Sequence, residues 1–316
     1  MPKGFFTQGV CILLERAVSL DQIEAALADF EIVGRAEADE SWAFRGASVS
    51  LAYRPESKGA VFVDVVEQTW PDDMGKPTDE PMIFTAWSMG HFGPFAYPGG
   101  LERASEQCWH WEEGKRTAAR HQAFLRIRST YVIGAEDDSP VMPEDYAAFP
   151  ELEFITQVAG ALIRLTDALC YFNPNGEILM DQAGLASAIE FSKENDLPPL
   201  DVWTNVRVNT LSEEWAAMDT VGCGQLDIPD SEAFSRVSTY DFNEVANFLR
   251  NVTLYLLNNG DVFNDGDTMD GPGNIQWQVF HESESLNDPP RDVLRWKPMD
   301  GVDVPAEFLP VFEEED

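Results

Sequence analysis

Residues 42–68, WAFRGASVSLAYRPESKGAVFVDVVEQ, contain the clearest strand pattern in the chain. In residues 42–53, apolar side chains alternate with small or polar ones, as expected of a strand that buries one face. Residues 59–68 form a second run that is rich in β-branched valine, which favours strands. The linker between the two runs contains Pro55 and Gly59 and favours a turn, so this stretch predicts a β-hairpin.

A strand and a helix are expected before this hairpin. Residues 9–14 (GVCILL) are a short apolar run that is typical of a strand. Ser19 followed by Gln22 is the pattern of a capping box at the start of a helix. The apolar residues of that helix recur at helical spacing, at Leu20, Ile23, Leu27 and Phe30.

The second half of the chain starts again with a strand, at residues 123–132, followed by a helix at 150–166. The strongest helix pattern covers residues 242–257, where Asp241 is the expected cap and Glu244 completes a capping box. A further helix is expected at 183–194, and further strands at 169–173, 202–211, 214–222, 275–280 and 292–298.

These elements predict an α+β protein. We expect two α/β sandwich-like subdomains, each a mostly antiparallel sheet with helices packed on one face. The N-terminal domain is expected to span residues 1–118 and the C-terminal domain residues 119–316, with the boundary near residues 112–121.

The charge of the chain is its strongest compositional signal. Its 316 residues include 56 acidic and 21 basic side chains, which give a formal net charge of −35 at pH 7. Such a field repels nucleic-acid phosphates and anionic lipid surfaces and attracts basic partners. We therefore expect a basic protein partner, no nucleic acid and no membrane. Halophilic adaptation or simple solubility are the alternative explanations of the charge.

The cysteines and the N-terminus indicate a reducing compartment. Cys11, Cys108, Cys170 and Cys223 lie far apart in the sequence and form no CxxC pair. The N-terminal apolar stretch is interrupted by Glu15 and Arg16 and is not typical of a signal peptide. A cytoplasmic location with four free thiols is expected.

The residue types that usually carry catalysis form no known motif. None of the four histidines, which are His91, His110, His121 and His281, has the spacing of a zinc-hydrolase motif. Ser88 lacks the first glycine of a nucleophile elbow. We therefore predict no catalytic residue, no metal ligand and no cofactor.

The run NDGDTMDG at residues 264–271 is the one candidate for a cation site. Asp265, Asp267 and Asp270 could gather around a divalent ion, but the calcium-loop pattern fails at Met269. A tight turn in which aspartates accept hydrogen bonds from backbone amides is the preferred interpretation.

Basic side chains are concentrated between Lys115 and Arg128. Arg126 and Arg128 lie on the same face of an expected strand, and in so acidic a chain they are expected to pair with its own carboxylates. A phosphate-binding site is the alternative.

Aromatic residues and methionine are unusually dense in residues 81–100. Such residues are frequent anchors of protein interfaces, although an inter-domain core is the alternative that we favour for this segment. The predicted partner-binding residues are Trp87 and Phe92, together with Glu136, Asp137 and Asp138 of the acidic loop that follows residue 132.

The C-terminal part, about residues 200–275, resembles a bacterial family of unknown function, numbered 4261. The resemblance rests on Trp203–Arg207, Thr220–Gly222 with Pro229 downstream, the helix FLRNVTLYLLNNG and Asp265–Met269. The glutamate that usually follows the proline is displaced here to Glu232. Proteins of this kind often lie beside genes for secreted toxins as presumed immunity factors, and the family carries no accepted activity.

The resemblance and the charge together predict a cytosolic immunity protein. It is expected to bind and neutralise a cognate secreted toxin of a type VI or polymorphic system, with a nuclease as the expected target, through an acidic surface. An enzyme of unrecognised type, with a site at an inter-domain cleft and Asp265, Asp267 or His91 contributing, is the alternative. A structural partner of a secretion or envelope system is a third.

Overall fold

The computed structural model describes residues 3–38, 46–132 and 140–308. The chain divides into two compact units, Met1–Trp203 and Thr204–Asp316. The boundary lies about 85 residues beyond the predicted division at 118/119. Each unit has its own sheet, and the prediction of an α+β protein with two mostly antiparallel sheets is confirmed.

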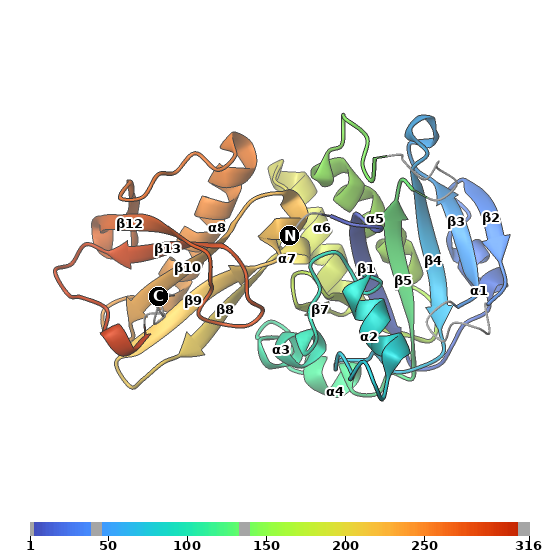
Figure 1. Cartoon of the computed structure of the whole chain (residues 1–316), viewed down its shortest axis with the longest axis horizontal. Coiled ribbons are helices and arrows are strands. Elements are labelled where there is room, and N and C mark those ends of the chain that lie inside the picture. Colours follow the sequence, from blue (N-terminus) through green and yellow to red (C-terminus); the bar gives the residue numbers. More distant parts are fainter. Residues whose placement is uncertain (1–2, 39–45, 133–139, 309–316) are drawn as a thin grey trace. The chain divides into compact units, whose positions relative to one another are not determined.

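The first unit contains a seven-stranded sheet (Figure 1). Its strands are β1 Gln8–Leu14, β2 Ile32–Ala36, β3 Ser48–Ala52, β4 Ala60–Val66, β5 Ala123–Thr130, β6 Ala168–Asn173 and β7 Ile178–Met180. Its helices are α1 Leu20–Ala26, α2 Pro81–Ser88, α3 Gly100–Glu106, α4 Gly114–Ala118, α5 Ala148–Leu162, α6 Gln182–Asn195 and α7 Leu200–Trp203.

The strand order of this sheet is β2-β3-β4-β5-β1-β6-β7, and all its pairs are antiparallel. β5 lies in the middle, between β4 and β1, with Arg126 opposite Cys11 on one side and Asp64 on the other. A division at 118/119 would cut β5 away from both neighbours. The predicted boundary is therefore wrong, because the second half of this sheet comes from beyond residue 119.

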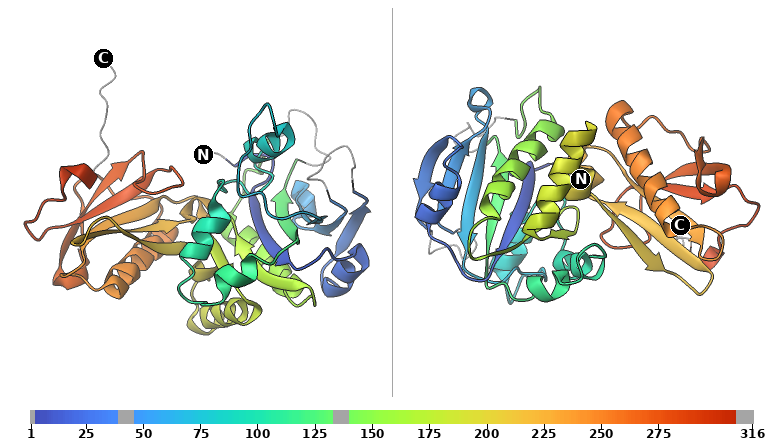
Figure 2. Two further views of the ribbon diagram at one scale, coloured as in Figure 1. Left: turned by 90° about the horizontal axis from the view of Figure 1, so that it is seen from below. Right: turned by 180° about the vertical axis from the view of Figure 1, so that it is seen from behind.

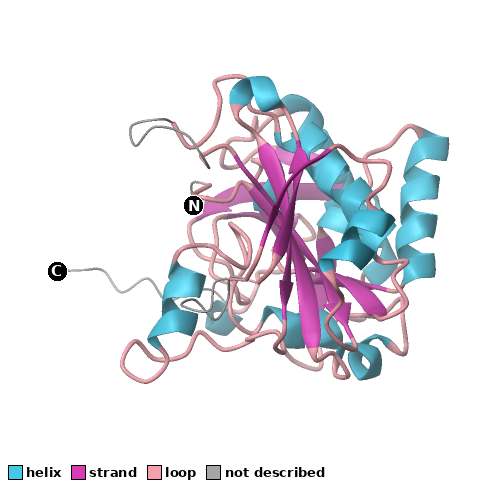
Figure 3. Cartoon of the chain, turned by 90° about the vertical axis from the view of Figure 1, so that its right-hand side faces the viewer, coloured by secondary structure: helices cyan, strands magenta, loops and turns pink. Residues whose placement is uncertain are grey.

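Both faces of the first sheet carry helices, whereas helices on one face only were predicted. On one face, Cys11, Leu13 and Phe124 of the strands pack with residues of α2, α3 and α4. α5 contacts β1 and β5 from the opposite face, and α6 packs beside it. Figures 1 and 2 show these two layers in front of and behind the strands, and Figure 3 shows helices on either side of the sheet.

Local sequence signals account for several of these elements. Ser19 and Gln22 form the predicted capping box at the start of α1, where Ser19 accepts a hydrogen bond from the Gln22 amide and Gln22 reaches back. β3 and β4 form the predicted hairpin, with Ser48 opposite Asp64 at its open end.

The second unit contains a six-stranded sheet in the order β11-β12-β13-β10-β9-β8. Its pairs are antiparallel except for β10 with β13, which is parallel. Its strands are β8 Asn205–Thr210, β9 Trp215–Val221, β10 Asp230–Arg236, β11 Thr268–Gly271, β12 Ile275–Glu282 and β13 Val293–Pro298. Its helix is α8 Phe242–Asn259.

α8 covers one face of this sheet, as predicted for a subdomain of this kind. Asp241 caps it by accepting from the Asn243 amide, and Val245, Leu249, Val252 and Leu256 are buried on one side. The ring of Phe248 packs edge-on against Trp296 and is tilted on Trp277.

The four cysteines all lie in the described residues and are free thiols, as predicted. Burial raises the pKa of Cys11, Cys170 and Cys223 well above the usual value of a thiol. Within the described ranges, no helix combines the length and the apolar character that crossing a membrane requires.

Candidate functional site

A row of charged side chains crosses the face of the second sheet that lies opposite α8. In the strand register, Arg207 of β8 lies beside Asp219 of β9, which lies beside Glu232 of β10, which lies beside Arg295 of β13. All four side chains are at least 97% buried. Burying ions is costly unless each finds a partner, so this row is stable only as a set.

Asp219 forms ion pairs with two arginines, Arg207 and Arg291. Arg207 donates from Nε to Oδ1 at 3.1 Å, and Arg291 donates from Nη2 to Oδ2 at 2.6 Å. Arg291 also lies 3.2 Å from Asp230. Burial alone would lower the pKa of Arg291, but Asp219 and Asp230 outweigh it and raise that pKa.

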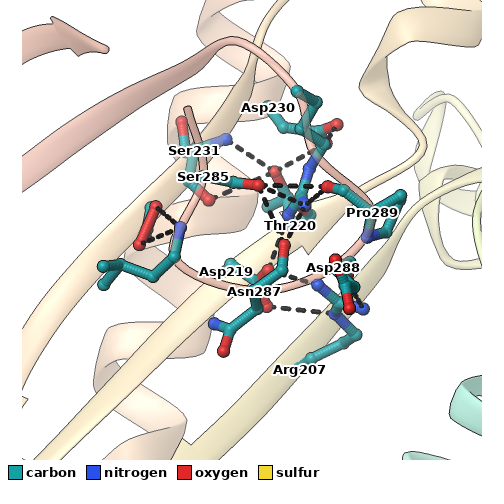
Figure 4. A network of polar contacts seen from close by, with 12 residues as sticks. Arg207, Asp219, Thr220, Asp230, Ser231, Ser285, Asn287, Asp288 and Pro289 are labelled. Atoms are coloured by element: carbon teal, nitrogen blue, oxygen red, sulfur yellow. Dashed lines mark hydrogen bonds and ion pairs between the residues drawn. The ribbon is translucent and has the colours of Figure 1, made fainter. Parts of the chain in front are cut away.

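Three arginines, Arg207, Arg291 and Arg295, hold the backbone of residues 283–292, which we call the clamped loop. Figure 4 shows Arg207 beside Asp219 and Asp288. Arg207 donates to the Asp288 carbonyl at 2.8 Å. Arg291 donates to the Asn287 and Pro289 carbonyls at 3.0 and 2.7 Å, and Arg295 donates to the Glu284 carbonyl at 3.0 Å. Four carbonyls of one loop are thus held by buried cations, which are charge-assisted donors.

Glu232 of the charged row also contacts the clamped loop. Both of its carboxylate oxygens accept the Leu286 amide at 3.2 Å, and Arg295 lies 3.6 Å away. Burial raises the pKa of Glu232, while Arg295 and the Leu286 amide oppose that rise.

A second small group of contacts joins β9 to β10 at the same end of the sheet. Thr220 donates to Asp230 at 3.0 Å and accepts the Ser231 amide at 2.8 Å. Asp230 also accepts the Cys223 amide at 3.1 Å. Asp230 therefore connects the turn after β9 to Arg291 and the clamped loop.

This geometry positions a surface and does not expose a reactive group. The arginines and carboxylates face one another and the loop backbone, while Glu284, Asp288 and Asp292 of the loop are exposed. A loop held in one conformation loses little entropy when it binds, which favours its use as a contact surface. The clamped loop is the candidate functional site.

Two of the predicted partner-binding residues lie elsewhere. Trp87 of α2 and Phe92 are buried, with 7% and 1% of their surface exposed, in the core of the first unit. Their rings contact each other and Trp70, and the Trp87 indole donates to the Pro71 carbonyl at 3.2 Å. The assignment of these aromatic residues to a surface is corrected, because they fill the core between α2 and the sheet. Glu136, Asp137 and Asp138 lie outside the described residues.

Residues 264–267 form the predicted turn, whereas Thr268–Gly271 form strand β11 and are not part of a turn. Asp267 accepts the Asn264 amide at 2.8 Å, and Asp265 accepts the His281 amide at 2.7 Å. Asp270 pairs instead with Gln276. No group of three or more possible metal ligands is present in the described parts of the chain. The Asp265 side chain raises the pKa of His281, which it also contacts through Nδ1 at 3.0 Å.

Arg126 and Arg128 pair with the chain's own carboxylate, as predicted. Both contact Asp64 of β4, and Arg128 lies over the ring of Phe6 at 3.9 Å. Burial would raise the pKa of Asp64, but the two arginines outweigh it and lower that pKa. Burial and the same arginines lower the pKa of His91 to about 4.

A groove of about 310 Å³ lies between α5 and α6 in the first unit. Its floor contains Ile163 and Leu185, and its rim contains Arg164, Glu190 and Lys193. These side chains do not form a nucleophile–base arrangement, and we assign the groove no chemistry.

The charged row and the clamped loop lie almost entirely between β9 and β13, and this segment matches a family model. Residues 219–297 match the family described as Domain of unknown function (DUF4261). The match covers about a quarter of the chain and agrees with the resemblance seen in the sequence, although it starts later and extends further than residues 200–275. No curated protein and no solved structure gives a match.

The DUF4261 segment contains Asp219, Asp230, Glu232, Arg291 and Arg295, and Arg207 lies just before it. Sequence reasoning assigned no role to these residues. The available signal was the position of single charges inside apolar strands, as in NVRVNT and DVLRWKP. Such charges are expected to be paired, but the sequence does not say which strands become neighbours.

Proposed function

We propose that this protein is a cytoplasmic immunity protein that binds a basic secreted toxin, with a nuclease as the expected target, and neutralises it. The observation that carries the proposal is the way in which the second unit distributes its charge. Residues 204–316 contain 23 acidic and 6 basic side chains, and 6 − 23 gives a net charge of −17.

Four of those six cations are already paired within the unit. Arg207 and Arg295 are in the charged row, Arg291 pairs with Asp219 of that row, and Arg236 contacts Asp300 at 2.8 Å. Among the carboxylates in the described part of the unit, Asp219, Asp230 and Glu232 are buried, and the others are partly or fully exposed with few cations to offset them. A surface of one sign steers an oppositely charged partner and raises the association rate.

A nuclease is a fitting target because it has to present a basic surface to phosphates. An acidic loop with a fixed backbone could occupy that surface in place of the nucleic acid. In the proposal, the clamped loop supplies these contacts through Glu284, Asp288 and Asp292. Inhibition of this kind needs no chemical step.

The test is to express the chain together with a toxin encoded beside it, and to titrate the purified toxin with the purified protein. The proposal expects cells to be rescued and activity to reach zero at one equivalent, with active, unaltered toxin recovered after separation in high salt. Protection by catalytic amounts, or a covalently altered toxin, would contradict it.

The location of the contact is tested by charge reversal. The triple variant Glu284→Lys, Asp288→Lys and Asp292→Lys should weaken inhibition much more than a matched control. The control reverses three exposed carboxylates of the first unit, Glu190, Glu194 and Asp196, and changes the net charge equally.

A further inference from the structure

Among the described residues, the first sheet has one exposed edge strand. β2 is the outermost strand (Figure 1), and four of its five residues are exposed. At the opposite edge, all three residues of β7 are buried. An exposed edge strand presents unpaired backbone groups that another strand can bind.

The register identifies which backbone groups of β2 point outward. Ala52 of β3 donates its amide to the Glu31 carbonyl at 2.9 Å. Every second residue of β3, counted from Ala52, therefore directs its backbone N–H and C=O toward β2. After an irregularity between Ile32 and Gly34, Ser50 lies opposite Gly34 and Ser48 lies opposite Ala36. Arg35, between these two, therefore directs its N–H and C=O away from β3, and so does Ile32. In the described sheet, β2 pairs with β3 alone.

Two exposed apolar side chains lie along this edge. Val33 is 57% exposed and Ile32 is 37% exposed. An added strand would cover both while it forms backbone hydrogen bonds, which is how sheet edges recognise extended peptides.

The charge around β2 identifies the kind of segment that fits. Its single cation, Arg35, is 2.8 Å from Asp21, 3.4 Å from Glu24 and 4.0 Å from Glu37. Asp29 and Glu31 are also exposed at the start of the strand. Three carboxylates thus lie within 4.0 Å of the one arginine of β2, and two more precede the strand in the sequence, so the segment from Asp21 to Glu37 is strongly acidic.

We propose that β2 is a second docking surface, on which an extended lysine- or arginine-containing segment of the basic partner pairs as an added strand. The identity of the partner rests on the proposed function, whereas the edge pairing can be tested without it. A second copy of this chain is a poor occupant, because each copy carries a net charge of −35.

The probe is a synthetic peptide of four Lys-Val repeats, added to the full-length protein while amide hydrogen exchange is followed residue by residue. Exchange at the Ile32 and Arg35 amides should slow by about tenfold or more, since both enter hydrogen bonds. A peptide of four Glu-Val repeats, and a Lys-Val peptide with two valines replaced by proline, should give no protection.

Two variants test the contact, one through a backbone N–H and the other through an apolar side chain. Arg35→Pro removes an outward N–H, as edge strands tolerate, and should weaken peptide binding by about fivefold to tenfold. It also removes a positive charge, so electrostatics alone would strengthen binding. Val33→Lys should weaken binding with no change in the backbone, while Val262→Lys, at an exposed valine of the second unit, should leave it unchanged.

Absence of peptide binding, protection at other amides only, equal effects of Val33→Lys and Val262→Lys, or dimerisation through β2 would each overturn this inference. These outcomes leave the proposed function standing if the toxin is still inhibited. If the peptide slows amide exchange at β2 but the protein inhibits no toxin, the proposed function is contradicted and the docking surface is supported.

Discussion

At the scale of single residues, Asp219 is the carboxylate on which the charged row depends. It is fully buried and receives both Arg207 and Arg291. Removing one member of a buried ion pair leaves its partner charged in a medium that solvates it poorly. In this protein two guanidinium groups would each lose an ion pair at once.

Asp219→Ala should therefore lower the free energy of unfolding by about 3–5 kcal/mol. Urea denaturation of both proteins measures this, with Glu213→Ala as the control. Glu213 is an exposed carboxylate of the same unit, and its removal should change stability by about 0.5 kcal/mol at most. A loss below about 1 kcal/mol for Asp219→Ala would mean that the row contributes little to folding.

Glu151 of α5 makes stability depend on pH. Burial raises its pKa above 4.5, although the hydroxyls of Tyr146 and Thr7 donate to it at 2.8 and 2.9 Å and oppose the rise. A carboxyl whose pKa is raised by folding binds its proton more tightly in the folded state. Its stabilising contribution is complete below the unfolded pKa and is lost as pH rises through the folded pKa.

Glu151→Gln, which cannot ionise, should therefore become more stable relative to the wild type as pH rises from about 4.5 to 7. Unfolding free energies across this range measure the difference, with the exposed Glu153→Gln as the control. A difference that is flat with pH, or that falls as pH rises, would contradict the assignment.

The sequence predicted some of these residue environments and not others. Pairing of Arg126 and Arg128 with a carboxylate followed from their alternation in a strand of a very acidic chain. The burial of Trp87 and Phe92 followed only in part, because an aromatic-rich segment suits both a core, which we favoured for it, and an interface. The core that decides between them includes Phe124 of β5 and Phe172 of β6, which are distant in sequence.

At the scale of elements, the clamped loop is irregular and yet fixed, because its carbonyls are held by Arg207 and Arg295 of the sheet and by Arg291 of the loop itself. Arg291 makes the largest number of these contacts, with two carbonyls of the loop and Ser285. Its removal should free the loop and leave the sheet in place.

Arg291→Ala should make the bond after Glu284 sensitive to a glutamate-specific protease that the wild type resists. Limited proteolysis under native conditions, followed by mass spectrometry, detects the cut. Arg116→Ala, which removes only an exposed ion pair with Glu113, is the control. Equal resistance of both variants would show that the loop is held by something other than Arg291.

Elements themselves were largely predictable because their signals are local. The capping box, the valine-rich hairpin and the periodicity of α8 each lie within about twenty residues. Pairing between strands is not local: β5 joins β1 across more than a hundred residues. The domain boundary depends on that pairing, and for this reason the division at 118/119 was wrong.

At the scale of the whole molecule, the second unit has its own sheet, its own helix and an internal set of ion pairs. The fragment 204–316 should therefore fold alone and unfold in one cooperative transition. Trp277 and Trp296 are buried in its core, and their fluorescence should shift to the red on unfolding. A fragment with exposed tryptophans and no transition would contradict the division at Trp203.

The central claim is that charge brings the partner to this protein and that short-range contacts hold it. The most direct test is to measure association and dissociation rates with the partner toxin at 0.05 and 0.5 M salt, where the Debye length falls from about 14 to about 4 Å. The account predicts that the association rate constant drops at least about tenfold while the dissociation rate constant changes much less. An association rate that is independent of salt would contradict it.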